Sequence, residues 1–148
     1  MLAGKYEVRK LVKKDITLDY FKLLQQLSII SLHDYNEQYN TIFFNSLHDN
    51  HQIYVIEELD NKKIIGSGTI WIEPKLIRNY GKVAHLEDLV IDNEFRGLGL
   101  GKVLLEHIVQ VAKDKGCYKC VLSCEPSLLT FYEKSGFINY GKHMRIDF

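Results

Sequence analysis

Two adjacent carboxylates and three closely spaced glycines stand in one short stretch of the sequence and could carry out chemistry together. Glu87 and Asp88 lie in the apolar run HLEDLVI, and Gly97, Gly99 and Gly101 follow it. Glycine permits positive φ and lets a ligand come close to the backbone. A helical pattern begins directly after the glycines, so the loop should present unpaired N–H groups at a helix N-terminus, where an anion is stabilised. The stretch therefore predicts a phosphate or pyrophosphate loop beside an acidic pair.

Two common phosphate-binding motifs do not fit this loop, although Arg96 and Lys102 flank it with positive charge. A P-loop would need glycine at Arg96 and a hydroxyl at Val103. The dinucleotide fingerprint would need its third glycine at Lys102 or Leu104. Short glycine patterns also arise by chance, and a strand-to-helix turn without a ligand is the alternative interpretation.

Hydrophobic periodicity predicts the elements that position this stretch. We expect strands at 6–12, 53–59, 63–72, 85–91 and 118–125, helices from 15 or 17 to about 30, at 35–47, from 103 to about 113 and at 127–134, and a strand pair within 137–148. Their order predicts an α/β fold, in which a mixed sheet carries helices on both faces.

Length and composition favour one domain, 1–148, that binds a small ligand. The chain has 148 residues, of which 46% are apolar, and 19 basic side chains balance 19 acidic ones. This balance argues against nucleic acid or an anionic membrane as the main partner. Met1 to Leu11 lacks the apolar region of a signal peptide, and no apolar run is long enough for a membrane helix, so we expect a cytoplasmic protein.

Three cysteines, Cys117, Cys120 and Cys124, superficially suggest a metal site. If 118–124 is a regular strand, Cys120 and Cys124 point to one face and Cys117 to the other. We therefore predict no metal.

Glu87 and Asp88 are consecutive, so a regular strand would send them to opposite faces. Both can face one substrate only if a β-bulge breaks the alternation there. Otherwise one of them pairs with a nearby lysine or arginine. The preceding segment holds Lys75, Arg78 and Lys82; scattered cations usually mark a solvated loop, but their position beside the acidic pair favours anion binding.

Two motifs resemble the GNAT acetyltransferase superfamily. Arg96-x-x-Gly99-x-Gly101 is similar to that family's R/Q-x-x-G-x-G/A signature, and residues 129–137, LTFYEKSGF, are similar to its FYxxxGF element. With the expected βαα start and hairpin, the resemblance covers nearly the whole chain. It implies the GNAT fold, with a mostly antiparallel mixed sheet of about six or seven strands, and acetyl-CoA as co-substrate.

A narrower resemblance is to the eukaryotic glucosamine 6-phosphate N-acetyltransferases, through HLEDLVI, GCYK at 116–119 and FYEK at 131–134. These enzymes make N-acetylglucosamine 6-phosphate on the route to UDP-N-acetylglucosamine. The resemblance implies acetylation of this amino sugar phosphate by direct attack in a ternary complex. Another small amine or a protein amine as substrate, or a non-catalytic CoA-binding module, are the alternatives.

The resemblance also implies roles for individual residues. Glu87 and Asp88 would hold the amine and accept its proton directly or through water, and Tyr132 would stabilise or protonate the leaving thiolate. The implied donor contacts are Leu89, Val90, Ile91, Arg96, Gly97, Leu98, Gly99, Leu100, Gly101, Lys102 and Tyr132. The implied substrate contacts are Ser28, Lys75, Arg78, Glu87, Asp88, Tyr118, Lys119, Ser123, Glu125 and Arg145. A homodimer is implied too, because a second subunit completes the site in that family.

The chain departs from the pattern of these enzymes at three positions. Ser123 stands where an acidic residue is expected, Asp147 where an arginine is expected, and Leu128 replaces an asparagine. Glu125 and Arg145 each lie two residues away, on the same face if these segments are strands, and could substitute. The departures bear on the sugar more than on acetyl transfer.

Overall fold

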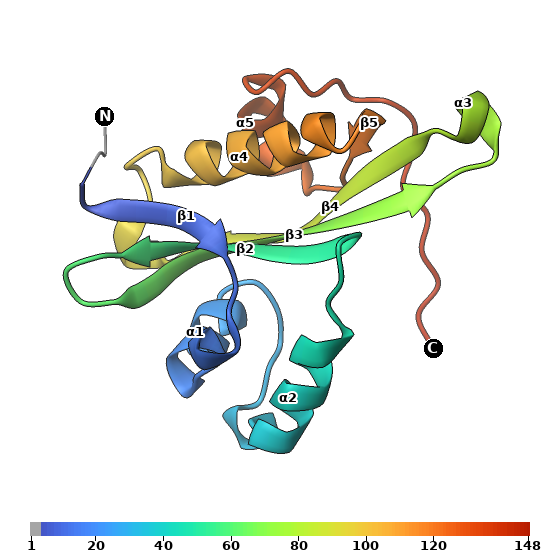
Figure 1. The fold of residues 1–148 in the computed structure, drawn as a ribbon. Helices are drawn as coiled ribbons and strands as arrows, with labels where there is room; N and C mark the ends of the chain where they lie inside the picture. Colours follow the sequence, from blue (N-terminus) through green and yellow to red (C-terminus); the bar gives the residue numbers. More distant parts are fainter. Residues whose placement is uncertain (1–3) are drawn as a thin grey trace.

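The computed structural model describes residues 4–148. In it, one β-sheet carries helices on both faces (Figure 1). Within this range the strand order is β1-β2-β3-β4-β5; neighbours from β1 to β4 are antiparallel, and β4 and β5 are parallel. The strands are β1 (Tyr6–Lys10), β2 (His51–Glu58), β3 (Lys63–Pro74), β4 (Lys82–Ile91) and β5 (Cys117–Val121). The helices are α1 (Leu18–Gln25), α2 (Glu37–Ser46), α3 (Ile77–Tyr80), α4 (Leu100–Asp114) and α5 (Leu129–Glu133), with short 3₁₀ turns η1 (Lys13–Asp15), η2 (Leu32–Asp34), η3 (Asn93–Phe95) and η4 (Pro126–Leu128).

The predicted α/β fold, with a mostly antiparallel mixed sheet between helices, is confirmed, but the predicted strand number is wrong. The described residues form five strands rather than six or seven. The difference lies in residues 137–148, which were expected to form a strand pair and instead run past the end of the sheet without regular structure (Figure 1). A strand requires a neighbouring backbone to accept and donate its hydrogen bonds. This segment finds no such neighbour within the single chain described here.

Helix α1 starts where the sequence predicted and ends earlier. The Thr17 hydroxyl accepts a hydrogen bond from the Tyr20 N–H at 3.3 Å and caps the helix. The helix ends at Gln25 rather than near Ile30, because Ser28 and the β-branched residues after it favour turn and extended backbone. Gln25 then donates its side-chain amide to the Ile30 carbonyl at 2.8 Å, which closes a loop.

Strand β5 also ends earlier than predicted, at Val121. Its pairing with β4 shifts register after Cys117, so that Tyr118 is an extra residue. The shift breaks the alternation and brings Cys117 and Cys120 to one face; the prediction of opposite faces was wrong. All three cysteines pack against the core below α4. Among residues 4–148 no group of three His, Cys, Asp or Glu side chains could hold a metal ion.

Helix α4 anchors the largest part of the core (Figure 1). An apolar stripe with helical spacing lies against the sheet: Leu100, Leu104, Leu105, Ile108 and Ala112. Burying one such side chain contributes about 1.5–3 kcal/mol, so this face fixes where the helix begins. On the opposite face, α1 buries Tyr20 and Leu23 in a second core cluster and lies against β3 and β4. None of the helices described is both long and apolar enough to cross a bilayer.

An ion-pair network joins α1 to the sheet. Arg9 on β1 donates to both carboxylate oxygens of Asp15, at 2.7 and 2.9 Å, and to Glu57 on β2 at 2.8 Å. Burial alone would raise the pKa of Asp15, but hydrogen bonds from Arg9 and from the Val12 N–H outweigh it and lower that pKa. The network therefore holds the chain in place where it enters α1.

Replacing Asp15→Asn tests this network. A carboxyl with a lowered folded-state pKa stabilises the fold above its unfolded pKa, and the contribution is lost as pH falls through the folded pKa. We expect a free energy of unfolding about 2 kcal/mol lower at about pH 7, with a deficit that shrinks below about pH 4. Urea unfolding measures both; the surface variant Asp19→Asn should change little. Equal deficits at neutral and acid pH would contradict this assignment.

Candidate active site

The ladder between β3 and β4 contains the predicted bulge. Glu87 lies opposite Thr69, but Asp88 and Leu89 share a single partner position, Gly68. Asp88 takes a left-handed backbone with φ of +52°, which Asp tolerates better than most residues. One extra residue is therefore inserted in β4 at the acidic pair.

The bulge turns both carboxylates to the face that carries α1. Leu86 and Leu89 both pack into the core on the α4 side although they are three residues apart. Glu87 and Asp88 lie between them and are exposed. The pKa of Tyr20, on α1, is raised to about 12. Burial is the main cause, and the negative charge of Asp88 raises this pKa further. Asp88 therefore lies near α1.

Strands β4 and β5 separate beyond the bulge. Their pairing ends where His85 meets Val121, although β4 continues to Ile91. A cavity of ≈ 620 Å³ opens beside this part of β4. Its lining comes from four regions of the chain: Gln26, Leu27, Leu89, Val90, Ile91, Phe95, Arg96, Gly97, Gly99, Leu100, Gly101, Lys102, Leu128, Phe131 and Tyr132. All predicted donor residues except the exposed Leu98 lie in this lining.

The cavity ends at the N-terminus of α4. Gly97 and Gly99 both have φ of +79°, and Gly99 is the N-cap, with no side chain capping the helix in the described chain. The first N–H groups of a helix have no partner within it, and here they belong to residues that line the cavity. Arg96 lies against this loop, because its Nε donates to the Ile91 carbonyl at 3.1 Å. This end of the cavity is suited to a diphosphate.

Tyr132 lies deep in the cavity wall. It stands near the end of the short helix α5, which follows directly on η4. Its ring is buried edge-on between Phe131 and Phe137. Burial raises the pKa of its hydroxyl, which therefore stays protonated at neutral pH and can donate a proton.

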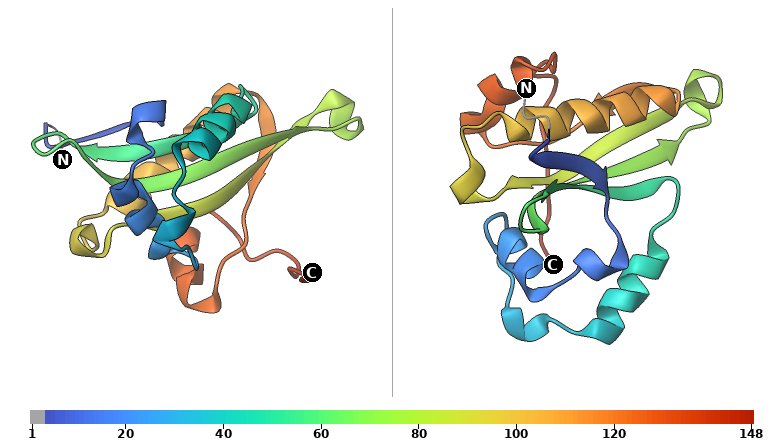
Figure 2. Two further views of the ribbon diagram at one scale, coloured as in Figure 1. Left: turned by 90° about the horizontal axis from the view of Figure 1, so that it is seen from below. Right: turned by 60° about the vertical axis from the view of Figure 1, so that its left-hand side comes forward.

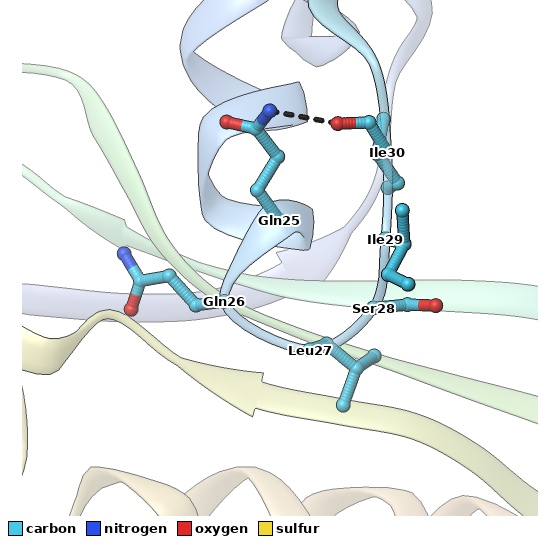
Figure 3. A pocket seen from close by; sticks show the side chains of 6 residues that line it. All are labelled: Gln25, Gln26, Leu27, Ser28, Ile29 and Ile30. Atoms are coloured by element: carbon cyan, nitrogen blue, oxygen red, sulfur yellow. Dashed lines mark hydrogen bonds between the residues drawn. The ribbon is translucent and has the colours of Figure 1, made fainter.

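Ser28 lies in a second, adjacent cavity of ≈ 400 Å³, lined by Gln25, Gln26, Leu27, Ser28, Ile29 and Ile30 (Figure 3). Gln26 and Leu27 line both cavities. The Oε1 atom of Gln26 accepts a hydrogen bond from the Asn93 N–H at 2.8 Å, which ties the loop after α1 to the segment leading into the glycine loop.

Gln26, Leu27 and Phe95 are cavity residues that sequence reasoning missed. No local signal identifies Gln26 and Leu27, because their proximity to the glycine loop depends on how α1 packs. Phe95 precedes the loop directly, but an apolar residue there fits the core equally well. Leu128 and Phe131 carried a signal: Phe131 belongs to the FY motif, and Leu128 stands three residues before it, as on one face of a helix turn.

A basic cluster forms at the turn between β3 and β4, which projects beyond α1 and α2 (Figure 2). The guanidinium carbon of Arg78 and the Nζ of Lys119 each lie 5.7 Å from the centroid of the Tyr118 ring. Gly81 allows this packing, since a Cβ there would lie 2.8 Å from the Tyr118 ring. Lys75 instead contacts Glu73 at 2.6 Å.

The other predicted substrate residues are not gathered in this cluster. Ser123 hydrogen-bonds His143 at 3.0 Å, and Glu125 is the N-cap of η4. Arg145 pairs with Asp147 at 2.8 and 3.1 Å. The expectation that Glu125 and Arg145 share strand faces with Ser123 and Asp147 was wrong, because neither segment is a strand.

Residues 16–137 match the model of the acetyltransferase (GNAT) family. The chain belongs to the GNAT acetyltransferase family. It is 38% identical over 146 residues to a glucosamine 6-phosphate N-acetyltransferase of Arabidopsis thaliana, with 97% of both chains covered. The enzyme of that name from Candida albicans is 35% identical over 147 residues, again with 97% of both chains covered.

A solved structure indicates the same family. The crystal structure of glucosamine-6-phosphate N-acetyltransferase from Arabidopsis thaliana superposes with a TM-score of 0.92 at 36% sequence identity, and covers 98% of this chain and 99% of that chain. The predicted family and GNAT fold are therefore confirmed.

GNAT acetyltransferases use acetyl-CoA, and the residues present fit this molecule. The bare amides at the start of α4 suit its diphosphate, Arg96 adds positive charge, and the strand end beside the cavity suits an amide-containing arm. The assignment of single donor-binding residues stays a prediction.

Gly99→Ala and Gly116→Ala separate ligand binding from backbone strain. These glycines flank α4 with φ of +79° and +76°, and a Cβ at either would meet nothing within 4 Å. Each alanine should therefore cost a similar ~1 kcal/mol of stability. Of these two glycines, only Gly99 lines the cavity. We therefore expect Gly99→Ala to weaken acetyl-CoA binding roughly tenfold, measured by calorimetry, and Gly116→Ala to leave the affinity unchanged. Equal changes in affinity would contradict the loop assignment.

Proposed function

We propose that this chain transfers the acetyl group of acetyl-CoA to the amine of glucosamine 6-phosphate. The product, N-acetylglucosamine 6-phosphate, lies on the route to UDP-N-acetylglucosamine, and we place the reaction in the cytoplasm. The observation that carries the proposal is the arrangement along one strand: a bulged acidic pair, Glu87 and Asp88, suits an ammonium group, and a basic cluster just before β4 suits a phosphate. The names of the Arabidopsis and Candida relatives support the same substrate.

Each part of the site has a role in the transfer. Acetyl-CoA supplies an acetyl group activated as a thioester. Leu89, Val90 and Ile91 offer backbone groups beside the cavity, and an N–H there polarises the thioester carbonyl. Glu87 and Asp88 hold the ammonium and take its proton, so the neutral nitrogen attacks the carbonyl carbon as the C–S bond breaks. Tyr132 donates its proton to the leaving sulfur, and the second proton of the nitrogen, which becomes acidic once the C–N bond has formed, restores the Tyr132 hydroxyl.

The phosphate side of the substrate is assigned to Arg78 and Lys119, with Tyr118 between them. Two cations at the same distance from one ring offer several N–H donors to phosphate oxygens. A cationic substrate such as a polyamine would be repelled here, which argues against the alternative GNAT substrates of that kind. Lys75 forms an ion pair with Glu73 at 2.6 Å, and its contribution to phosphate binding is correspondingly smaller.

We also propose that the chain works as a homodimer. The C-terminal residues alternate between apolar and polar as a strand does, and the apolar ones are exposed: Ile138, Tyr140, Met144, Ile146 and Phe148. Such a segment gains a partner if it pairs with a second copy. Sedimentation velocity should give a dimer, and Ile146→Lys should shift it toward monomer; a parent that is monomeric at micromolar concentration contradicts this part of the proposal.

A comparison of glucosamine 6-phosphate with glucosamine as acetyl acceptors tests the proposed substrate. We expect CoA release from acetyl-CoA with glucosamine 6-phosphate and at least tenfold lower kcat/KM with glucosamine. Arg78→Gln should lower kcat/KM for the phosphorylated sugar roughly tenfold and leave the rate with glucosamine unchanged. Equal rates for the two sugars would refute the phosphate assignment, and faster acetylation of another amine would favour a different GNAT substrate.

Tyr132→Phe tests the proton donor. Because the ring and its packing are retained, acetyl-CoA affinity should stay within about twofold, while kcat falls on the order of 10- to 100-fold. Tyr39→Phe, at an exposed position on α2, serves as the control. An unaltered kcat in Tyr132→Phe would exclude the hydroxyl from the chemistry.

A further inference from the structure

A row of ring side chains crosses the sheet on the face that carries the acidic pair. His51 on β2, Trp71 on β3 and His85 on β4 lie opposite one another in register. The rings of His51 and Trp71 meet edge-on, with centroids 5.5 Å apart. His85 makes a different contact: its Nε2 lies 2.9 Å from Oε2 of Glu73 on the neighbouring strand. Of the two histidines in the row, only His85 has such a carboxylate contact within the described chain.

The contact with Glu73 fixes the proton on His85. The pKa of Glu73 is lowered, first by its hydrogen bond from Lys75 and then by that from His85, so its carboxylate is ionised. An ionised carboxylate can only accept hydrogen bonds, so Nε2 of His85 must be the donor. In the neutral ring the other nitrogen, Nδ1, is then free to take up a proton.

His85 is also close to the predicted reacting centre. Pairing is regular from His85 to Glu87, so both side chains lie on the same face, two residues apart. That separation is about 6.6 Å along a strand. Two hydrogen bonds of about 2.8 Å, in line through one water, span most of this distance.

We propose that the Glu73–His85 dyad is the final acceptor of the proton that leaves the substrate amine. The inference rests on the proposed function and extends it. One ammonium proton passes to Glu87 and then through a bridging water to Nδ1 of His85, which leaves the nitrogen neutral for attack. As the N–C bond forms and the C–S bond breaks, Tyr132 gives its proton to the sulfur and is reprotonated by the second proton that the nitrogen loses. Imidazole binds a proton more strongly than a carboxylate and is the better base near neutral pH. Glu73 acts as the positioning residue.

The test separates proton uptake by His85 from a purely structural contact between the two strands. His85→Gln keeps an amide that can still donate to Glu73, but it cannot take up a proton near neutral pH. His51→Gln makes the same substitution two positions away in the row, on β2, without a carboxylate partner in the described chain. Glu73→Gln keeps an acceptor for Nε2 and removes the charge.

With glucosamine 6-phosphate and acetyl-CoA, we expect kcat of His85→Gln to fall on the order of 100-fold while both KM values stay within about threefold. The kcat of Glu73→Gln should fall less than that of His85→Gln, and the kcat of His51→Gln should match that of the parent. Imidazole added to the buffer should restore part of the kcat of His85→Ala, because it supplies the missing base. A parent-like kcat in His85→Gln, or a loss in His85→Ala that imidazole does not relieve, would overturn the dyad while leaving the proposed function standing. A parent that is inert toward glucosamine 6-phosphate would overturn both.

Discussion

The extra residue in β4 at Asp88 is the constraint on which the rest of the site depends. It lets two consecutive carboxylates share one face, and the strand turns its apolar residues back to the α4 side immediately after it. Gly68, opposite the bulge, makes this arrangement possible, because a Cβ there would lie 2.8 Å from Ile108 Cδ1 and 3.0 Å from Leu89 Cδ1. The missing side chain lets α4 pack directly over the bulge. The acidic pair and the donor cavity therefore arise from one local irregularity.

Packing of α4 transmits this arrangement to the glycine loop. The helix is held to the sheet by its apolar stripe, so its bare N-terminus is fixed at the point where β4 ends. The loop after α1 closes the other side through Gln26 and Asn93. Arg9 and Asp15 in turn hold α1. With the α5 residues Phe131 and Tyr132, the donor site is thus assembled from four regions that meet only after folding.

The sequence predicted those parts of the site that are local. The glycine loop and the helix behind it follow from residue types and spacing over a short stretch. The bulge was the condition for both carboxylates to share one face, and all three features are present in the structure. Gln26 could not be predicted, because its contact with Asn93 joins residues far apart in the sequence. The register shift at Tyr118 escaped prediction for a similar reason, since it depends on how β5 pairs with β4. The predicted C-terminal strands fail because their apolar pattern finds no partner within one chain.

The structure of a complex with acetyl-CoA is the measurement that tests this account most directly. The account predicts the diphosphate against the amides of residues 97–102 and the thioester beside β4 at the bulge, with its sulfur near the Tyr132 hydroxyl. Acetyl-CoA bound elsewhere, with the α4 N-terminus free and β4 and β5 closed together beyond His85, would contradict it.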